Sequence, residues 1–188
     1  MKKLSLEELK RPSLEEYKEL PKIPVVLILD NIRSGLNVGS IFRTADAFKI
    51  EKIYLVGITT RPPHREILKT AIGADQAVDW EYQESIVSLA KKLKAEAYEL
   101  IGIEQTDQSV MLNDFQIDIN KKYALIFGNE VGGISDDALE ELDTVIEVPQ
   151  HGTKHSLNVS VCAGLLIWHF YCGFTLKGLD SGILIFPP

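Results

Sequence analysis

Short apolar runs alternate with helical patterns along most of the chain, and this alternation limits the possible folds more than any other feature. The runs lack the polar–apolar alternation of half-exposed strands, which is typical of strands buried on both faces. Helices between such strands are the usual crossovers of a parallel sheet. We therefore expect an α/β fold with a mostly parallel sheet and helices on both faces.

The expected elements follow one another in a regular order. The expected strands are Val25–Leu29, Lys52–Val56, Ala77–Trp80, Tyr98–Ile103, Tyr123–Phe127 and Thr144–Val148. The expected helices are Val38–Phe48, His64–Ala71, Glu84–Leu93, Ser135–Leu142 and Leu157–Tyr171. Two short charged helices within Leu4–Leu20, separated by Pro12, precede them, whereas Lys177–Pro188 fits no clear element. The sequence thus predicts an N-terminal helical arm, residues 1–22, and a single domain, residues 23–188.

Length and charge narrow the class of protein. The chain of 188 residues is long enough for one domain with a sizeable core. A net charge of −7 argues against a broadly basic nucleic-acid binder. Contact with a nucleic acid would need a local basic patch, and scattered surface charges are the commoner outcome. The candidates for such a patch are Arg33, Arg61, His64, Arg65, Lys69, Lys154 and His155.

The cysteines, the histidines and the N-terminus favour a cytoplasmic protein without a metal. Cys162 and Cys172 are not spaced as C-x-x-C, and we interpret them as reduced core residues. The four histidines show no metal-binding spacing. The charged N-terminus does not resemble a signal peptide. Polar residues interrupt the apolar stretch Leu157–Leu176, which favours a helix buried on most sides over a membrane span.

Three predicted strand exits are candidates for a functional site, because ligands of open parallel sheets bind beyond the carboxyl ends of strands. The first exit, Asp30–Thr44, contains glycines, asparagines and two arginines. Asn37 is placed to cap the helix that carries Arg43. Arg43 lies among apolar residues, so we expect its flanks to be partly buried, and a buried guanidinium needs an anionic or acceptor partner. The alternative is a plain turn and cap, with Arg43 on a solvated face.

The second exit, Gly128–Ser135, is rich in glycine but matches neither G-x-G-x-x-G nor a P-loop. It contains more glycines than a plain strand-to-helix turn needs, which favours backbone bent around a ligand. Glu130 is either a ligand contact or an acidic residue favoured at a helix start.

The third exit, Pro149–Asn158, leads from a β-branched run into the last predicted helix. Helix starts expose N–H groups that suit carboxylate or phosphate groups. The simpler interpretation is that Ser156 only caps this helix.

Taken together and in this order, the three exits resemble the three motifs of the SpoU (TrmH-like) RNA ribose methyltransferases of the SPOUT class. The first motif is matched by Asn37–Thr44, the second by Leu125–Gly133, and the third by Ile146–Ser160. The motifs frame most of the chain. One departure is Pro149-Gln150, where many members have Pro-Met.

The resemblance implies a fold, a cofactor and a reaction. Members have a parallel α/β sheet with a C-terminal trefoil knot, and they form homodimers with the active site near the subunit interface. The implied cofactor is S-adenosyl-L-methionine, and the implied reaction is methylation of a ribose 2′-hydroxyl in tRNA or rRNA. No metal and no membrane are implied.

The resemblance also implies roles for individual residues. Phe127, Gly128, Val148 and Leu157 are expected to line the cofactor pocket. Arg43 has the central activating role, and because Arg is a poor base we expect it to anchor an RNA phosphate. Asn37 is expected to orient Arg43, whereas Glu130, Ser156 and Asn158 are expected to support the cofactor loops and the substrate. The five residues Arg43, Asn37, Glu130, Ser156 and Asn158 are the candidate catalytic set.

Two other functions remain open from the sequence alone. One is a knotted-fold RNA-binding module with weak or no catalytic activity. The other is a nucleotide-binding α/β enzyme unrelated to RNA, which the missing dinucleotide fingerprint and P-loop disfavour.

Overall fold

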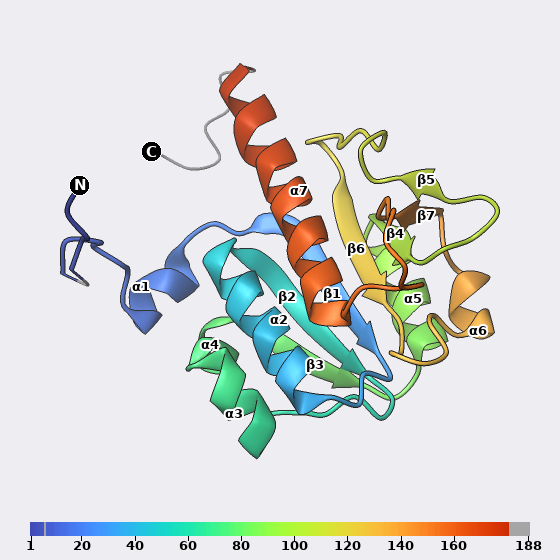
Figure 1. Ribbon diagram of the computed structural model, residues 1–188, viewed down its shortest axis with the longest axis horizontal. Helices are drawn as coiled ribbons and strands as arrows, with labels where there is room; N and C mark the ends of the chain where they lie inside the picture. The colour runs from blue at the N-terminus through green and yellow to red at the C-terminus, as the bar shows by residue number, and fades with distance from the viewer. Residues whose placement is uncertain (6, 181–188) are drawn as a thin grey trace.

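The computed structural model describes residues 1–5 and 7–180 and contains a seven-stranded parallel sheet (Figure 1). Along the sheet the strand order is β3-β2-β1-β6-β4-β7-β5. The strands are β1 (Ile23–Asp30), β2 (Ile50–Val56), β3 (Trp80–Gln83), β4 (Tyr98–Ile103), β5 (Val110–Met111), β6 (Lys122–Phe127) and β7 (Thr144–Glu147). The helices are α1 (Leu14–Glu19), α2 (Gly35–Ala47), α3 (Arg65–Ala71), α4 (Ala74–Ala77), α5 (Ile86–Ala95), α6 (Asp136–Leu139) and α7 (Val159–Asp180). The α/β fold and the parallel sheet are confirmed.

Helices cover both faces of the sheet, as the unbroken apolar runs predict (Figure 1). One core cluster joins inward side chains of the central strands to α2, α3, α4 and α7. A second cluster joins the opposite side chains of the same strands to α5 and α6. Within β1, Leu27 belongs to the first cluster and Ile28 to the second, and both are fully buried.

Some predicted element boundaries are wrong. The expected strand Ala77–Trp80 is the end of α4 followed by the edge strand β3, in which Trp80 pairs with Ile53. Strand β5 was not predicted because two residues carry no periodicity. The last helix begins two residues later than expected and continues to Asp180. Residues 181–188 of the predicted domain lie outside the described part of the chain.

Among the described residues of the predicted arm, the structure has one helix rather than two. Residues 7–10 form only a turn, whereas α1 begins with a capping box between Ser13 and Glu16. The hydroxyl of Tyr17 donates a hydrogen bond to the carbonyl of Asp46 at 3.0 Å. This bond, together with burial of the Tyr17 ring, attaches α1 to the end of α2.

The order of the strands brings distant loops together beside β1 and beside β4. Strand β1 lies between β2 and β6, so the loops that follow β1 and β6 emerge side by side. Strand β4 lies between β6 and β7, which makes the loops after β4, β6 and β7 neighbours as well. Ligands of open α/β sheets bind at such switch points.

Candidate cofactor and RNA site

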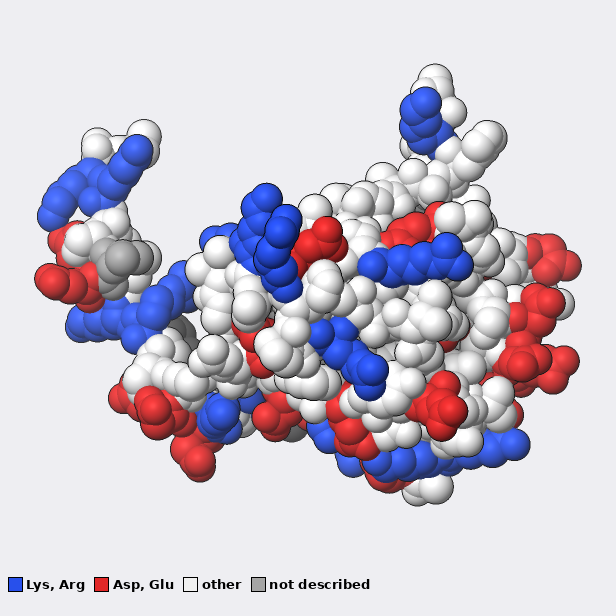
Figure 2. All heavy atoms as spheres, turned by 90° about the horizontal axis from the view of Figure 1, so that it is seen from below, with Lys and Arg blue, Asp and Glu red and all other residues white. Residues whose placement is uncertain are grey.

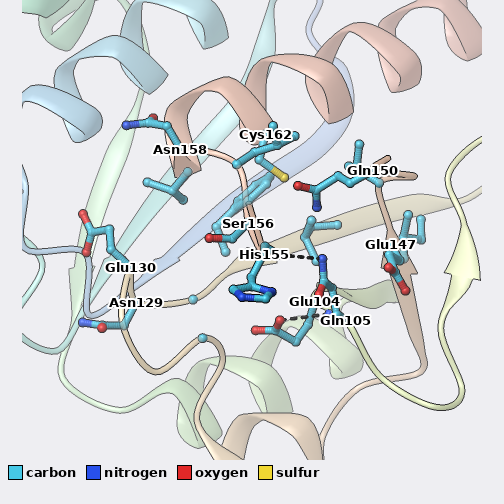
Figure 3. A pocket seen from close by; sticks show the side chains of 18 of the residues that line it. Glu104, Gln105, Asn129, Glu130, Glu147, Gln150, His155, Ser156, Asn158 and Cys162 are labelled. Carbon is cyan, nitrogen blue, oxygen red and sulfur yellow. Dashed lines mark hydrogen bonds between the residues drawn. The ribbon is translucent and has the colours of Figure 1, made fainter. Parts of the chain in front are cut away.

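The carboxyl ends of β4, β6 and β7 surround a pocket of about 470 Å³ (Figure 3). Four segments line it: the exits of these three strands and the residues that lead into α7. The lining residues expected from the sequence are Phe127, Gly128, Glu130, Val148, Ser156, Leu157 and Asn158. The volume falls within the range of small-molecule sites.

The loop after β6 folds back closely on itself. Asn129 and Gly133 exchange two backbone hydrogen bonds of 2.9 Å each. A Cβ atom on Gly128 would lie 2.2 Å from the backbone carbon of Gly133, so a side chain here would force the loop open. This close approach explains the glycine-rich second motif and leaves backbone groups at the pocket wall.

Glu130 links this loop to the first turn of α2. Its carboxylate accepts hydrogen bonds from the backbone N–H groups of Arg33 and Ser34, both at 3.4 Å, and from Nδ2 of Asn37 at 3.2 Å. Burial alone would raise the pKa of Glu130, but these bonds and one from its own N–H hold that pKa below its usual value. Glu130 is therefore ionised at neutral pH.

Asn158 joins the same network from the start of α7. Its Nδ2 donates to Oδ1 of Asn37 at 3.1 Å, while its Oδ1 accepts from the N–H and the hydroxyl of Ser160 at 2.8 Å and 2.6 Å. The structure thus brings three members of the candidate catalytic set, Asn37, Glu130 and Asn158, into one chain of hydrogen bonds.

The caps of both helices differ from the sequence prediction. Ser34 caps α2 by accepting a bond from the N–H of Asn37, so Asn37 lies in the first turn and is not the cap. Asn158, not Ser156, caps α7 and stands just outside the helix. Asn37 can use its whole side chain to bridge loops, because Ser34 already caps α2. Asn158 caps α7 with its Oδ1 and reaches Asn37 with its Nδ2.

Arg43 lies on the exposed side of α2, six residues beyond Asn37 and about 9 Å along the helix axis. The expectation of a partly buried Arg43 is wrong, because its apolar neighbours Ile41, Phe42 and Ala45 turn inward and leave the guanidinium outside. Within the described residues, Arg43 makes no hydrogen bond or ion pair, and it does not line the pocket of its own chain.

Glu104 and Gln105, at the exit of β4, hold the pocket together and were missed in the sequence. The Glu104 carboxylate accepts from the backbone N–H of Ile134 at 3.1 Å, and a Cβ on Gly133 would lie 2.1 Å from its Oε2. The Gln105 side chain donates to the carbonyl of His155 at 3.1 Å (Figure 3). This pair, the Glu104–Gln105 clasp, ties the β6 exit to the segment before α7. Both residues follow the predicted strand Tyr98–Ile103, and ligands of open parallel sheets bind beyond the carboxyl ends of strands, so the sequence does contain a signal for them.

The pocket is acidic. Glu104, Glu130 and Glu147 line it, and no lysine or arginine does. Burial, with a further contribution from the charge of Glu104, raises the pKa of the Cys162 thiol at the pocket wall to about 11. Such a surface favours a ligand that carries positive charge.

The basic residues do not form one broad patch on the face seen in Figure 2, where blue side chains stand in separate groups and red ones crowd one edge. The basic side chains on this face are therefore scattered, which is the commoner arrangement for surface charges. Both cysteines are free and half-buried. In the described part of the chain, no cluster of side chains is suited to a metal ion, and no helix has the length and apolarity to cross a membrane.

Comparison with known proteins gives this arrangement a family. Residues 24–168 match the SpoU rRNA Methylase family. The chain is 32% identical over 148 residues to the Mus musculus protein named tRNA (guanosine(18)-2′-O)-methyltransferase TARBP1. This alignment covers 78% of this chain and 9% of that protein. Over eight curated relatives, the chain spans 9% to 61% of the relative's length.

Two crystal structures resemble the fold closely. The A. aeolicus TrmH/SpoU tRNA modifying enzyme has a TM-score of 0.78 at 25% identity, with 89% of this chain and 84% of that chain covered. The AdoMet-bound rRNA methyltransferase from Sinorhizobium meliloti has a TM-score of 0.73 at 25% identity, with 82% and 58% covered. The match over most of the sequence confirms the resemblance of the three motifs: the chain belongs to the SpoU rRNA Methylase family.

Proposed function

We propose that the protein is an S-adenosyl-L-methionine-dependent methyltransferase that methylates a ribose 2′-hydroxyl in tRNA or rRNA. The observation that carries this proposal is the acidic pocket at the ends of β4, β6 and β7, with the Asn37–Glu130–Asn158 network at its side. The named activities of the relatives and the AdoMet-bound state of the S. meliloti structure support it.

The residues present fit this cofactor. The three carboxylates suit a ligand with a positively charged sulfur, and the backbone groups exposed around Gly128, Val148 and Leu157 can take the polar atoms of a nucleoside. When bound, the cofactor supplies a methyl group from that sulfur. We assign Phe127, Gly128, Val148 and Leu157 to cofactor binding.

The chain's own residues position the substrate. The ribose oxygen must lie in line with the donated methyl group, and much of the rate gain is expected from that alignment. We propose that Arg43 grips the phosphate beside the target ribose with its planar guanidinium. The Asn37–Glu130–Asn158 network holds α2, the β6 loop and α7 in fixed relation, and Ser156 supports the loop before α7.

We propose that two copies of the chain form a homodimer and that Arg43 of each copy serves the pocket of the other. Arg43 is exposed and does not line the pocket of its own chain, which supports a composite site. A stripe of exposed apolar residues on α7 supports the dimer, contrary to the expected burial of this helix on most sides. The stripe consists of Val161, Leu165 and Trp168, which are 43% to 54% exposed. Stripes of this kind mark interfaces.

We further propose the architecture and location that the family resemblance implies. Residues 23–188 form one SPOUT domain with a C-terminal trefoil knot, and residues 1–22 form an arm attached through α1. The protein works in the cytoplasm, where Cys162 and Cys172 stay reduced.

One experiment tests the proposed reaction directly. The protein is incubated with methyl-labelled cofactor and unmodified total tRNA or rRNA, and the RNA is digested and analysed by mass spectrometry. We expect label on a 2′-O-methyl nucleoside. Label on a base, or cofactor binding without any transfer, would refute the reaction, and the latter result would favour an RNA-binding module.

A further inference from the structure

The arginines of this chain differ from its lysines in their partners. Every ion pair among residues 1–5 and 7–180 uses a lysine and none uses an arginine, although the chain has five arginines. Two unpaired arginines, Arg33 and Arg61, are exposed and lie in the loops that follow β1 and β2. An exposed guanidinium without a carboxylate partner keeps its full capacity to bind an external anion.

The loops that carry these two arginines are locked together. The Thr60 N–H donates to the carbonyl of Ile32 at 3.3 Å, and the Thr60 hydroxyl donates to the carbonyl of Arg33 at 3.0 Å. Below them, the buried Thr59 hydroxyl accepts from the N–H of Ile32 at 3.0 Å and donates to the carbonyl of Leu29 at 2.8 Å. The two arginines therefore stand on a rigid base, which lowers the entropy lost on binding.

Tyr82 fixes the side chain of Arg61. The guanidinium carbon lies 4.1 Å from the centroid of the Tyr82 ring, a cation–π distance. Tyr82 is on β3 and remains 36% exposed. Such a contact restricts the position of the planar guanidinium, whose fork of N–H donors suits a phosphate.

This surface continues directly from the candidate site. The backbone N–H of Arg33 is 3.4 Å from the Glu130 carboxylate, which belongs to the pocket wall. The loops that carry Arg33 and Arg61 therefore adjoin the pocket wall through backbone contacts.

We propose that Arg33, Thr60, Arg61 and Tyr82, here called the arginine ledge, bind the RNA phosphates that flank the target ribose. This inference rests on the proposed function and adds the surface that selects an RNA strand over a free nucleoside. The guanidinium of Arg61, held against Tyr82, and that of Arg33, on an anchored backbone, replace the broad basic patch that an acidic protein lacks.

Binding of unmodified tRNA transcripts and of a fluorescein-labelled single-stranded RNA, measured by anisotropy at several salt concentrations, tests the ledge. Arg61→Ala is expected to weaken binding about tenfold, the size of one charge-assisted contact. It should also reduce the slope of log Kd against log salt by about 0.7. Arg61→Lys and Tyr82→Leu should each weaken binding several-fold, because they remove the fork or its platform.

Arg11→Ala is the matched control, since it removes the same charge from an arginine of the N-terminal arm. Its RNA affinity should stay within about twofold of the wild type. Equal losses in Arg11→Ala and Arg61→Ala, or no loss in Arg61→Ala, would overturn the ledge. Calorimetry with S-adenosyl-L-methionine should give the same Kd for every variant. If the wild type itself binds no RNA and transfers no methyl group, the proposed function fails and the ledge fails with it.

Discussion

Asn158 donates a hydrogen bond to Asn37 across 121 residues of sequence, at 3.1 Å. The bond joins the start of α7 to the first turn of α2, and Glu130 accepts from the other atom of the same Asn37 amide. The Asn37 amide therefore links α2, α7 and the loop after β6 through two hydrogen bonds.

Asn158→Asp separates the two roles of Asn158. Asp is as good a helix cap as Asn, so the variant keeps the bond from the Ser160 N–H but loses the donor to Asn37. We expect methyl transfer to fall about tenfold, the value of a bond near 1.4 kcal/mol, with little change in melting temperature. Asn158→Ala should lose the activity and also about 1 kcal/mol of stability. Equal stability losses in both variants would reduce Asn158 to a structural residue.

Arg43→Ala should abolish most methyl transfer while S-adenosyl-L-methionine binding and melting temperature stay unchanged, because the side chain is exposed and lies outside its own pocket. A mixture of Arg43→Ala and Asn158→Asp protomers tests the composite site. Random pairing leaves one intact site in half of the dimers, so activity should recover to about a quarter of the wild type. No recovery in co-refolded mixtures would show that Arg43 serves its own chain.

Leu165→Glu should convert the proposed dimer into a monomer, because it places a charge in the α7 stripe. Leu68→Glu on α3 is the matched control, since Leu68 is 46% exposed and Leu165 is 43% exposed. Light scattering of both variants distinguishes an interface from a general effect of added charge. A wild-type protein that is monomeric at all concentrations would contradict the dimer.

Gln105→Ala removes one half of the Glu104–Gln105 clasp and should weaken cofactor binding several-fold, because the segment before α7 loses its bond to the β4 exit. The rate at saturating cofactor should change much less. Gln108→Ala, in the same loop but outside the pocket, serves as the control. Unchanged affinity in Gln105→Ala would show that the clasp does not shape the pocket.

Glu130→Gln should change how stability depends on pH. The pKa of Glu130 is lowered in the folded protein, so its carboxylate stabilises the fold above its ordinary value of 4.5. That contribution is lost as the pH falls from 4.5 through the folded-state pKa. Melting temperature should therefore fall less steeply over this range in Glu130→Gln than in the wild type. An unchanged acid slope would mean that the N–H bonds to the Glu130 carboxylate are weak in solution.

The sequence by itself determined the parallel sheet and the order of its motifs. Apolar runs such as that of β1 are unbroken because both sheet faces are covered, and the covered faces follow from local periodicity alone. The glycines of the second motif are likewise readable, since only a tight backbone turn requires them.

Only the tertiary structure decided which polar groups meet. The bonds of Asn37 with Glu130 and Asn158 span 93 and 121 residues, and they exist because β1 lies beside β6 in the sheet. The exposed position of Arg43 and the role of Gln105 also depend on which helix face turns inward and which strands are neighbours. Strand order is set by packing of the whole core, and no window of sequence contains it.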